Sequence, residues 1–424
     1  MQSSDIGAGK EPGIAIAPVV TLLLSASLLV LGNGLQGTLL VVRAGNEGFR
    51  EETIGAMMAA YFAGYALGAL LLPPLVASAG HIRAFAGFAS IASAVTLVHI
   101  LLLDAWSWTV LRAITGFAYA GMILVTESWL NAHAVSSARG RILSLYGILT
   151  MGVWALGQGL LNLASPDGVV LFLVVSILVS LALVPITLLP SRPPMVPLQA
   201  RLGLRQLVVI SPLGTSGALL SGLALSAFWA MGPSFAQGAR LDTAGISAFM
   251  AAALIGALCL QWPLGWLADK HPRRLVIAFA ALGSALAAAG LVLAADASLP
   301  VLLVLSFVFG AFGIPLYTLC VAHTNDRLDT GEMLAAARSL LLLNGLGAAV
   351  GSFAAGVAMS WLGPKGLFAQ TAVLLVVLAL VAVLRRFEGP AEASVSSPLP
   401  CAPQITMAFD TRGEDRADGT VGAQ

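Results

Sequence analysis

The sequence predicts an all-α polytopic membrane protein with twelve transmembrane helices. Its 424 residues are 58% hydrophobic and only 10% charged, whereas about a quarter of the residues of a soluble protein are charged. The chain also contains twelve apolar segments of at least 19 residues, each long enough to cross about 30 Å of hydrocarbon as a helix. Eleven of these segments contain no charged residue, as expected for helices that face lipid.

The expected helices follow one another with short connections. The uncharged segments are 12–42, 53–82, 84–103, 142–166, 168–191, 206–239, 243–268, 275–295, 297–325, 339–364 and 366–384. The twelfth segment, about 107–131, contains Arg112 and Glu127. A polar stretch precedes the first segment, which is too long for a signal-peptide core, so we expect it to remain as the first helix.

The distribution of positive charge predicts the orientation of the chain. With the N-terminus in the cytoplasm, the inner face collects fourteen basic residues and the outer face only four. The four on the outer face are Arg43, Arg50, Arg240 and Lys365. Because basic residues concentrate on the cytoplasmic side, we expect a multi-pass protein of a bacterial cytoplasmic (inner) membrane with both termini in the cytoplasm.

The chain divides into two halves of six segments each. We expect a cytoplasmic N-terminal tail (1–13), a first six-helix bundle (14–189), a Pro-rich basic linker (190–211), a second six-helix bundle (212–386) and a disordered cytoplasmic tail (387–424). Similar residues recur between the halves: Gly64 and Gly256 are 192 residues apart, and Arg141 and Arg338 are 197 apart. Two parallel six-helix repeats are typical of one large class of transporters.

The loop after the eighth segment contains a recognisable motif. It reads Gly265-Trp266-Leu267-Ala268-Asp269-Lys270-His271-Pro272-Arg273-Arg274. This resembles the G-x-x-x-D-[RK]-x-[GP]-[RK]-[RK] signature of the major facilitator superfamily, and the resemblance covers residues 14–386. It implies the major facilitator fold and transport of a small solute. The corresponding loop after the second segment has lost the acid, because Ala77 stands where Asp269 does.

The charged fourth segment is the strongest candidate for function. Arg112-Ala113-Ile114-Thr115-Gly116 resembles the R-x-x-x-G motif on the fourth helix of the superfamily. Arg112 either reaches outward to the interface or faces the central cavity as an anion site or coupling charge. Thr126–Trp129 and Ser137–Arg141 resemble the YcaD-like branch of bacterial major facilitators. Glu127 lies within reach of Arg139 and Arg141, which favours a structural or gating ion pair over a proton-carrying role.

Two further sets of residues complete the predicted site. Polar and aromatic residues within the segments either bond between helices or line the solute path. The candidates for substrate binding or coupling are Arg112, Asn33, Gln36, Tyr61, Tyr65, Gln158, Trp229, Gln261 and Asn344. The candidates for gating at the cytoplasmic face are Glu127, Arg139, Arg141, Gly265, Asp269, Lys270, Arg273 and Arg274.

These observations predict a secondary transporter rather than an enzyme. We expect it to carry a small organic solute by alternating access, through proton-coupled efflux or exchange. A metabolite facilitator or symporter is an alternative, and a membrane sensor or scaffold is an alternative of another class. No metal motif or ATP-binding loop occurs in the sequence, so we expect no cofactor. The expected partners are the solute, protons and the lipid bilayer, without nucleic acid, and we expect a monomer.

Overall fold

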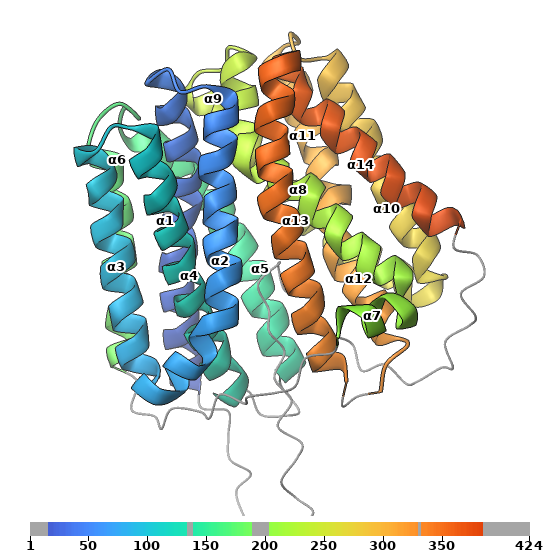
Figure 1. Cartoon of the computed structure of the whole chain (residues 1–424), viewed down its shortest axis with the longest axis horizontal. Helices are drawn as coiled ribbons and strands as arrows, with labels where there is room; N and C mark the ends of the chain where they lie inside the picture. Colours follow the sequence, from blue (N-terminus) through green and yellow to red (C-terminus); the bar gives the residue numbers. More distant parts are fainter. Residues whose placement is uncertain (1–15, 134–138, 189–202, 330–331, 385–424) are drawn as a thin grey trace, which may run out of the picture.

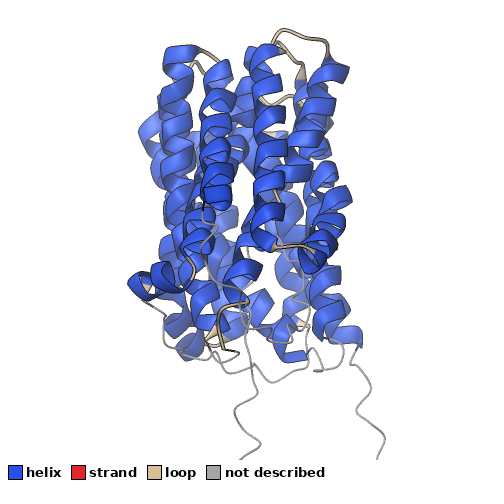
Figure 2. Ribbon diagram, turned by 90° about the vertical axis from the view of Figure 1, so that its right-hand side faces the viewer, coloured by secondary structure: helices blue, strands red, loops and turns tan. Residues whose placement is uncertain are grey.

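A computed structural model describes residues 16–133, 139–188, 203–329 and 332–384. The described residues contain twelve helical spans that are long and apolar enough to cross a membrane. They form one upright bundle in which the long helices run between the same two ends of the molecule (Figures 1 and 2). The all-α fold with twelve spans is therefore confirmed.

The N-terminal half contains six spans and one short helical turn. Its elements are α1 (Ile16–Asn46), α2 (Glu51–Ala79), α3 (His81–Leu101), α4 (Ala105–His133), α5 (Arg139–Gly159), the 3₁₀ turn η1 (Leu160–Leu163) and α6 (Val170–Thr187). The short helix α7 (Leu204–Ile210) precedes the C-terminal half.

The C-terminal half also contains six spans, one of which is broken. Its elements are α8 (Pro212–Gly238), α9 (Thr243–Lys270), α10 (Arg273–Leu293), α11 (Leu299–Gly313), α12 (Leu316–Asn325), α13 (Met333–Leu362) and α14 (Lys365–Leu384). Helices α11 and α12 form one span, Leu299–Asn325. The break falls at Pro315, because proline has no N–H group to continue the hydrogen bonds of a helix.

The two halves repeat one packing pattern. In the first half, α2 packs on α4, α1 on α5 and α6, and α3 on α4 and α6. In the second half, the corresponding helices make the same pairs: α9 with α11, α8 with α13 and α14, and α10 with α11 and α14. Contacts between the halves are paired as well, since α2 packs on α13 and α5 packs on α9. The structure therefore contains the predicted six-helix pseudo-repeats.

Glycines at equivalent positions allow the closest helix contacts. A Cβ on Gly64 would collide with the backbone of Ala113 on α4, and one on Gly256 would collide with the backbone of Phe307 on α11. Small residues permit this approach within a membrane, where packing and hydrogen bonds hold helices together. The two glycines, which are 192 residues apart in the sequence, therefore make the equivalent helix contact in each half.

The halves meet tightly at one end of the molecule. We call it the closed end: it carries the loops 47–50 and 239–242 and lies at the top of Figure 1. There α2 and α13 approach so closely that a Cβ on Gly356 would lie 2.5 Å from the Glu51 backbone oxygen and 2.9 Å from the Gly55 Cα. The opposite end carries the loops from α2 to α3 and from α9 to α10.

Candidate functional site

A central cavity lies between the two halves, below the closed end. It has a volume of about 150 Å³ and is lined by α1, α2, α4 and α5 of one half and by α8, α9 and α13 of the other. Ile314, at the break between α11 and α12, also lines it. Of the nine residues predicted to bind solute or couple, seven line this cavity: Asn33, Tyr61, Tyr65, Arg112, Gln158, Trp229 and Asn344.

Arg112 is placed by the glycine one turn further along α4. A Cβ on Gly116 would collide with the backbone oxygen of Tyr61, so glycine lets α4 lie directly against α2. The Arg112 guanidinium then lies over the Tyr61 ring, 4.1 Å from its centroid, in a cation–π contact. The residue is only 1% exposed, which argues against the alternative in which Arg112 reaches outward to the interface.

The Arg112 side chain retains hydrogen-bonding capacity. Its Nε and Nη1 atoms have no hydrogen-bond partner among the described residues. The Tyr61 hydroxyl donates to Asn33 Oδ1 at 3.1 Å, which leaves the Asn33 amide nitrogen as a donor. A cation and an amide donor therefore meet at the wall formed by α1, α2 and α4.

Two tryptophans meet across the boundary between the halves at the cavity wall. Trp154 on α5 stacks on Trp229 on α8, with ring centroids 4.5 Å apart and 23° between the planes. Both residues line the cavity. Trp154 was not among the predicted site residues, because nothing in its sequence neighbourhood distinguishes it from a lipid-facing aromatic residue.

Gln158 and Asn344 line the cavity, and their side-chain amides form hydrogen bonds between neighbouring helices. Gln158 accepts a hydrogen bond from Thr38 Oγ1 at 2.5 Å and donates to the Gly34 backbone oxygen at 3.1 Å. Asn344 donates from Nδ2 to the Ala218 backbone oxygen at 2.9 Å. These bonds tie α5 to α1 and α13 to α8 within each half.

The remaining two solute-binding candidates, Gln36 and Gln261, do not line the cavity. Gln36 is fully buried, and its Nε2 donates to Thr96 Oγ1 on α3 at 2.9 Å. Gln261 is half-buried and lies seven residues beyond the cavity-lining Leu254 on α9, about two helical turns away.

Among the described residues, five side-chain hydrogen bonds join the two halves at the closed end. Ser234 Oγ donates to Glu51 Oε2 at 2.7 Å, and Gln237 Nε2 lies 3.1 Å from both the Val42 backbone oxygen and Asn46 Oδ1. Near the start of α9, Ser247 Oγ donates to the Gln158 backbone oxygen at 2.7 Å and accepts from Asn162 Nδ2 at 3.2 Å.

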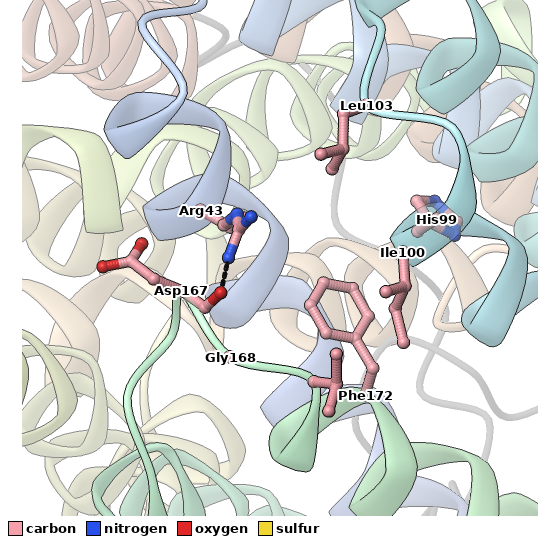
Figure 3. A pocket seen from close by; sticks show the side chains of 8 residues that line it. Arg43, His99, Ile100, Leu103, Asp167, Gly168 and Phe172 are labelled. Carbon is pink, nitrogen blue, oxygen red and sulfur yellow. Dashed lines mark hydrogen bonds between the residues drawn. The ribbon is translucent and has the colours of Figure 1, made fainter.

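A second, smaller cavity of about 40 Å³ lies within the N-terminal half (Figure 3). Arg43 and Asp167 line it on one side, and His99 and Phe172 line it on the other. Arg43 Nη1 donates to the Asp167 backbone oxygen, drawn as a dashed line. All of its described lining residues belong to the N-terminal half, unlike those of the central cavity.

Comparison with known proteins identifies the family. The model of the Major Facilitator Superfamily matches residues 22–324 and again 214–409. The chain belongs to the Major Facilitator Superfamily. It is therefore a multi-pass membrane protein of a secondary-transporter family, as the motifs at the junction of α9 and α10 and on α4 predicted.

Relatives agree with the YcaD-like resemblance. The chain is 26% identical over 383 residues to an uncharacterized MFS-type transporter of Enterobacter sp. (strain 638), covering 88% of this chain and 97% of the relative. It is 27% identical over 340 residues to the uncharacterized MFS-type transporter YcaD of Escherichia fergusonii, covering 79% and 87%.

Solved structures show the same major facilitator fold. The nucleoside transporter NupG superposes with a TM-score of 0.70 at 14% identity, covering 87% of this chain and 98% of that one. A bacterial homologue of the human lysosomal transporter Spinster, inward-facing and unoccupied, superposes with a TM-score of 0.71 at 14% identity, covering 89% and 97%.

The superfamily signature, which was predicted as a loop, spans the last turns of α9 and the start of α10, and it forms ion pairs within the C-terminal half. Arg273 lies between two carboxylates, with Nη2 3.1 Å from Asp269 Oδ1 and Nε 3.1 Å from Asp326 Oδ2. Asp326 follows α12, and burial raises the pKa of its carboxyl group while Arg273 opposes that shift. Lys270 lies over the Trp266 ring, 4.0 Å from its centroid. Gly265, one residue before Trp266, has open space where a Cβ would stand.

The other gating candidates are only partly described. Glu127 is 1% exposed on α4 and forms a hydrogen bond with the Tyr146 hydroxyl on α5. The side chains of Arg139 and Arg141 lie outside the described residues. Arg274 has an interaction partner of its own. Ion pairing between Glu127 and the two arginines stays a prediction.

Proposed function

We propose that this chain carries a small organic solute across a bacterial cytoplasmic membrane by alternating access, as a proton-coupled exporter or an exchanger. The observation that carries the proposal is a cavity lined by both halves and sealed at one end by contacts between those halves. Rocking of the two repeats around a fixed midplane site is the usual mechanism of such folds. The fold similarity to inward-facing and nucleoside-transporter structures supports it.

The orientation follows from the charges of the loops. Under the positive-inside rule the closed end faces outward and both termini face the cytoplasm. The described conformation then has its cavity sealed from the outside, and transport requires a second conformation in which the closed end separates. The five hydrogen bonds and the Gly55–Gly356 contact would break in that second state.

Proton coupling would rest on Glu127. This carboxylate is buried in α4 and interacts with Tyr65, which lines the cavity. A change in its protonation would alter the contact between α4, α2 and α5, the helices that form one wall of the cavity.

A facilitator is the second candidate, and one observation favours it. The lining of the cavity contains no carboxylate among the residues that the structure describes. A solute could therefore cross without meeting a protonation site, in which case the pH gradient would not drive its movement.

The test measures from which side of the membrane the cavity can be reached. In a variant without cysteines, Asn33→Cys is treated with an impermeant maleimide in vesicles of each orientation. Alternating access predicts labelling from both faces, whereas a sensor or scaffold held in the described conformation predicts labelling from one face only. Counterflow of labelled organic acids and amines in proteoliposomes, with and without a pH gradient, then separates proton coupling from facilitated diffusion.

A further inference from the structure

The charge that lines the central cavity is positive, and no described lining residue carries a negative charge. Arg112 is the one charged residue among the described side chains that line it. The guanidinium is buried, lies against Tyr61 and has two nitrogen atoms without hydrogen-bond partners. Among the described residues, the lining of the cavity therefore has a single positive charge and no negative charge.

A buried charge without a counter-charge is unfavourable, since it has lost its hydration and gained no ion pair in exchange. The cation–π contact with Tyr61 compensates for part of this loss. An anion placed at Nε and Nη1 would compensate for the rest through charge-assisted hydrogen bonds. The neighbouring Asn33 amide nitrogen adds a second donor on the same wall.

The rest of the cavity is suited to an apolar, planar group. Aromatic residues from both halves line it: Tyr61, Phe62, Tyr65, Trp154 and Trp229. Trp154 and Trp229 stack on each other at this wall, and aromatic side chains of this kind also pack favourably against other aromatic rings. Two of the three described lining amides already form hydrogen bonds to neighbouring helices, those of Gln158 and Asn344, so Asn33 is the lining amide that has a donor available for the solute.

We propose that the solute of this transporter is an amphipathic aromatic anion, whose single negative charge pairs with Arg112 and whose ring lies against Trp154 and Trp229. The proposal rests on the function proposed above and names the class of molecule that occupies its cavity. It also assigns different roles to two walls: charge selection to the α2–α4 wall and ring binding to the α5–α8 tryptophans.

The test is equilibrium binding to the full chain in lipid nanodiscs, measured by calorimetry with four probes. Naphthalene-2-sulfonate has a permanent negative charge and an aromatic ring. Naphthalene-2-sulfonamide keeps the ring without the charge, methanesulfonate keeps the charge without the ring, and 2-naphthylmethylamine reverses the charge. We expect the naphthalenesulfonate to bind at least about tenfold more tightly than each of the others, since one hydrogen bond to a charged group supplies that much discrimination against the sulfonamide and the amine, and burial of the ring supplies it against methanesulfonate.

Variants separate the two walls. Arg112→Gln should reduce the preference for naphthalenesulfonate over its sulfonamide to about one, while Arg112→Lys, which keeps the charge but loses the forked pair of donors, should retain only part of it. Trp154→Leu should weaken binding of naphthalene-2-sulfonate and of its sulfonamide about tenfold each and leave the ratio of the two affinities unchanged. Arg240→Gln removes an exposed arginine outside the cavity and should change neither quantity. Thermal melting of each variant shows whether it folds.

The outcomes bear on the two proposals separately. Equal binding of the sulfonate and the sulfonamide, tighter binding of the amine, or no binding of any naphthyl probe would overturn the aromatic-anion proposal, whether or not the cavity is reached from both faces. Probe binding by a chain whose Asn33→Cys variant is labelled from one face only would support the ligand class and contradict transport.

Discussion

The contact between α2 and α13 makes a specific prediction about Gly356. In the described conformation, an alanine Cβ at this position would lie 2.5 Å from the Glu51 backbone oxygen and 2.9 Å from the Gly55 Cα. Ordinary contact begins at 3.4 Å, so the helices must separate by about 0.9 Å to accept the methyl group. Both obstacles are backbone atoms, and no change of rotamer relieves them.

The strain should shift the balance between conformations rather than unfold the chain. Overpacking of this kind costs about 1–3 kcal/mol, and the cost disappears when the closed end separates. Gly356→Ala should therefore raise the population of the open-ended state about 5- to 150-fold relative to wild type.

The assay measures the distance between spin labels attached at Glu47→Cys and Arg240→Cys by double electron–electron resonance. These exposed positions lie on the two loops of the closed end, one in each half. Wild type should show mainly a short distance, and Gly356→Ala should gain a second, longer one.

Two glycine substitutions serve as matched controls. A Cβ on Gly351, five residues earlier on α13, collides with Leu223 within the same half, and one on Gly37 meets no atom within 4 Å. Gly351→Ala should lower the melting temperature without lengthening the label distance, and Gly37→Ala should change neither. A Gly356→Ala distribution identical to wild type at unchanged stability would refute the assignment of this contact to a separable gate.

Three further predictions follow from the site and its surroundings. Ser234→Ala removes the hydrogen bond to the half-buried carboxylate of α2 and should favour separation of the closed end by about 1 kcal/mol, seen as a longer label distance. Arg112→Ala should abolish counterflow while the protein still inserts in the membrane at wild-type levels; full flux would mean that this side chain is not part of the transport site. Asp269→Asn breaks the pair with Arg273 within the C-terminal half, which is worth about 1 kcal/mol or less; because the pair is already formed in the conformation sealed from the outside, cytoplasmic labelling at Asn33→Cys should not rise, and a clear rise would mean that the pair holds the cytoplasmic end shut.

The fold could be predicted almost entirely from the sequence because the membrane imposes simple rules. Charge-free segments of sufficient length must be helices in lipid. The Pro-rich linker between the first six and the last six apolar segments indicated the division into two halves. The break at Pro315 was not predicted, although proline is the expected cause.

A cavity residue could be predicted from the sequence only where a chemically distinctive side chain also lay on the helix face that is turned toward the cavity. Arg112 stood out as a charge at membrane depth, and Gly116 explains why it meets α2. On α1 the cavity side follows Val30, Asn33 and Gly37, one turn apart, and Gln36 lies on another face of that helix. Nothing in the sequence alone shows which face of a helix is turned inward when all faces are apolar.

The hydrogen bonds between the halves at the closed end could not be predicted from the sequence, for a different reason. Ser234, Gln237 and Ser247 are small or uncharged residues near helix ends, where they resemble ordinary surface positions. Their partners are up to 195 residues away in the chain, and only the pairing of the two halves brings them together. Interactions between repeats therefore require the assembled structure.

The central claim is that the two ends of the molecule open in turn around one cavity. It is tested most directly by measuring two label pairs in wild type: Glu47→Cys with Arg240→Cys at the closed end, and Ser78→Cys with His271→Cys at the opposite end. All four positions are exposed, and each pair spans the two halves. Alternating access predicts that each perturbation, addition of naphthalene-2-sulfonate or the substitution Gly356→Ala, changes the label distances at the two ends in opposite directions. When the distance at one end lengthens, the distance at the other end shortens. A single unchanging distance at each end, or both ends lengthening together, would contradict it.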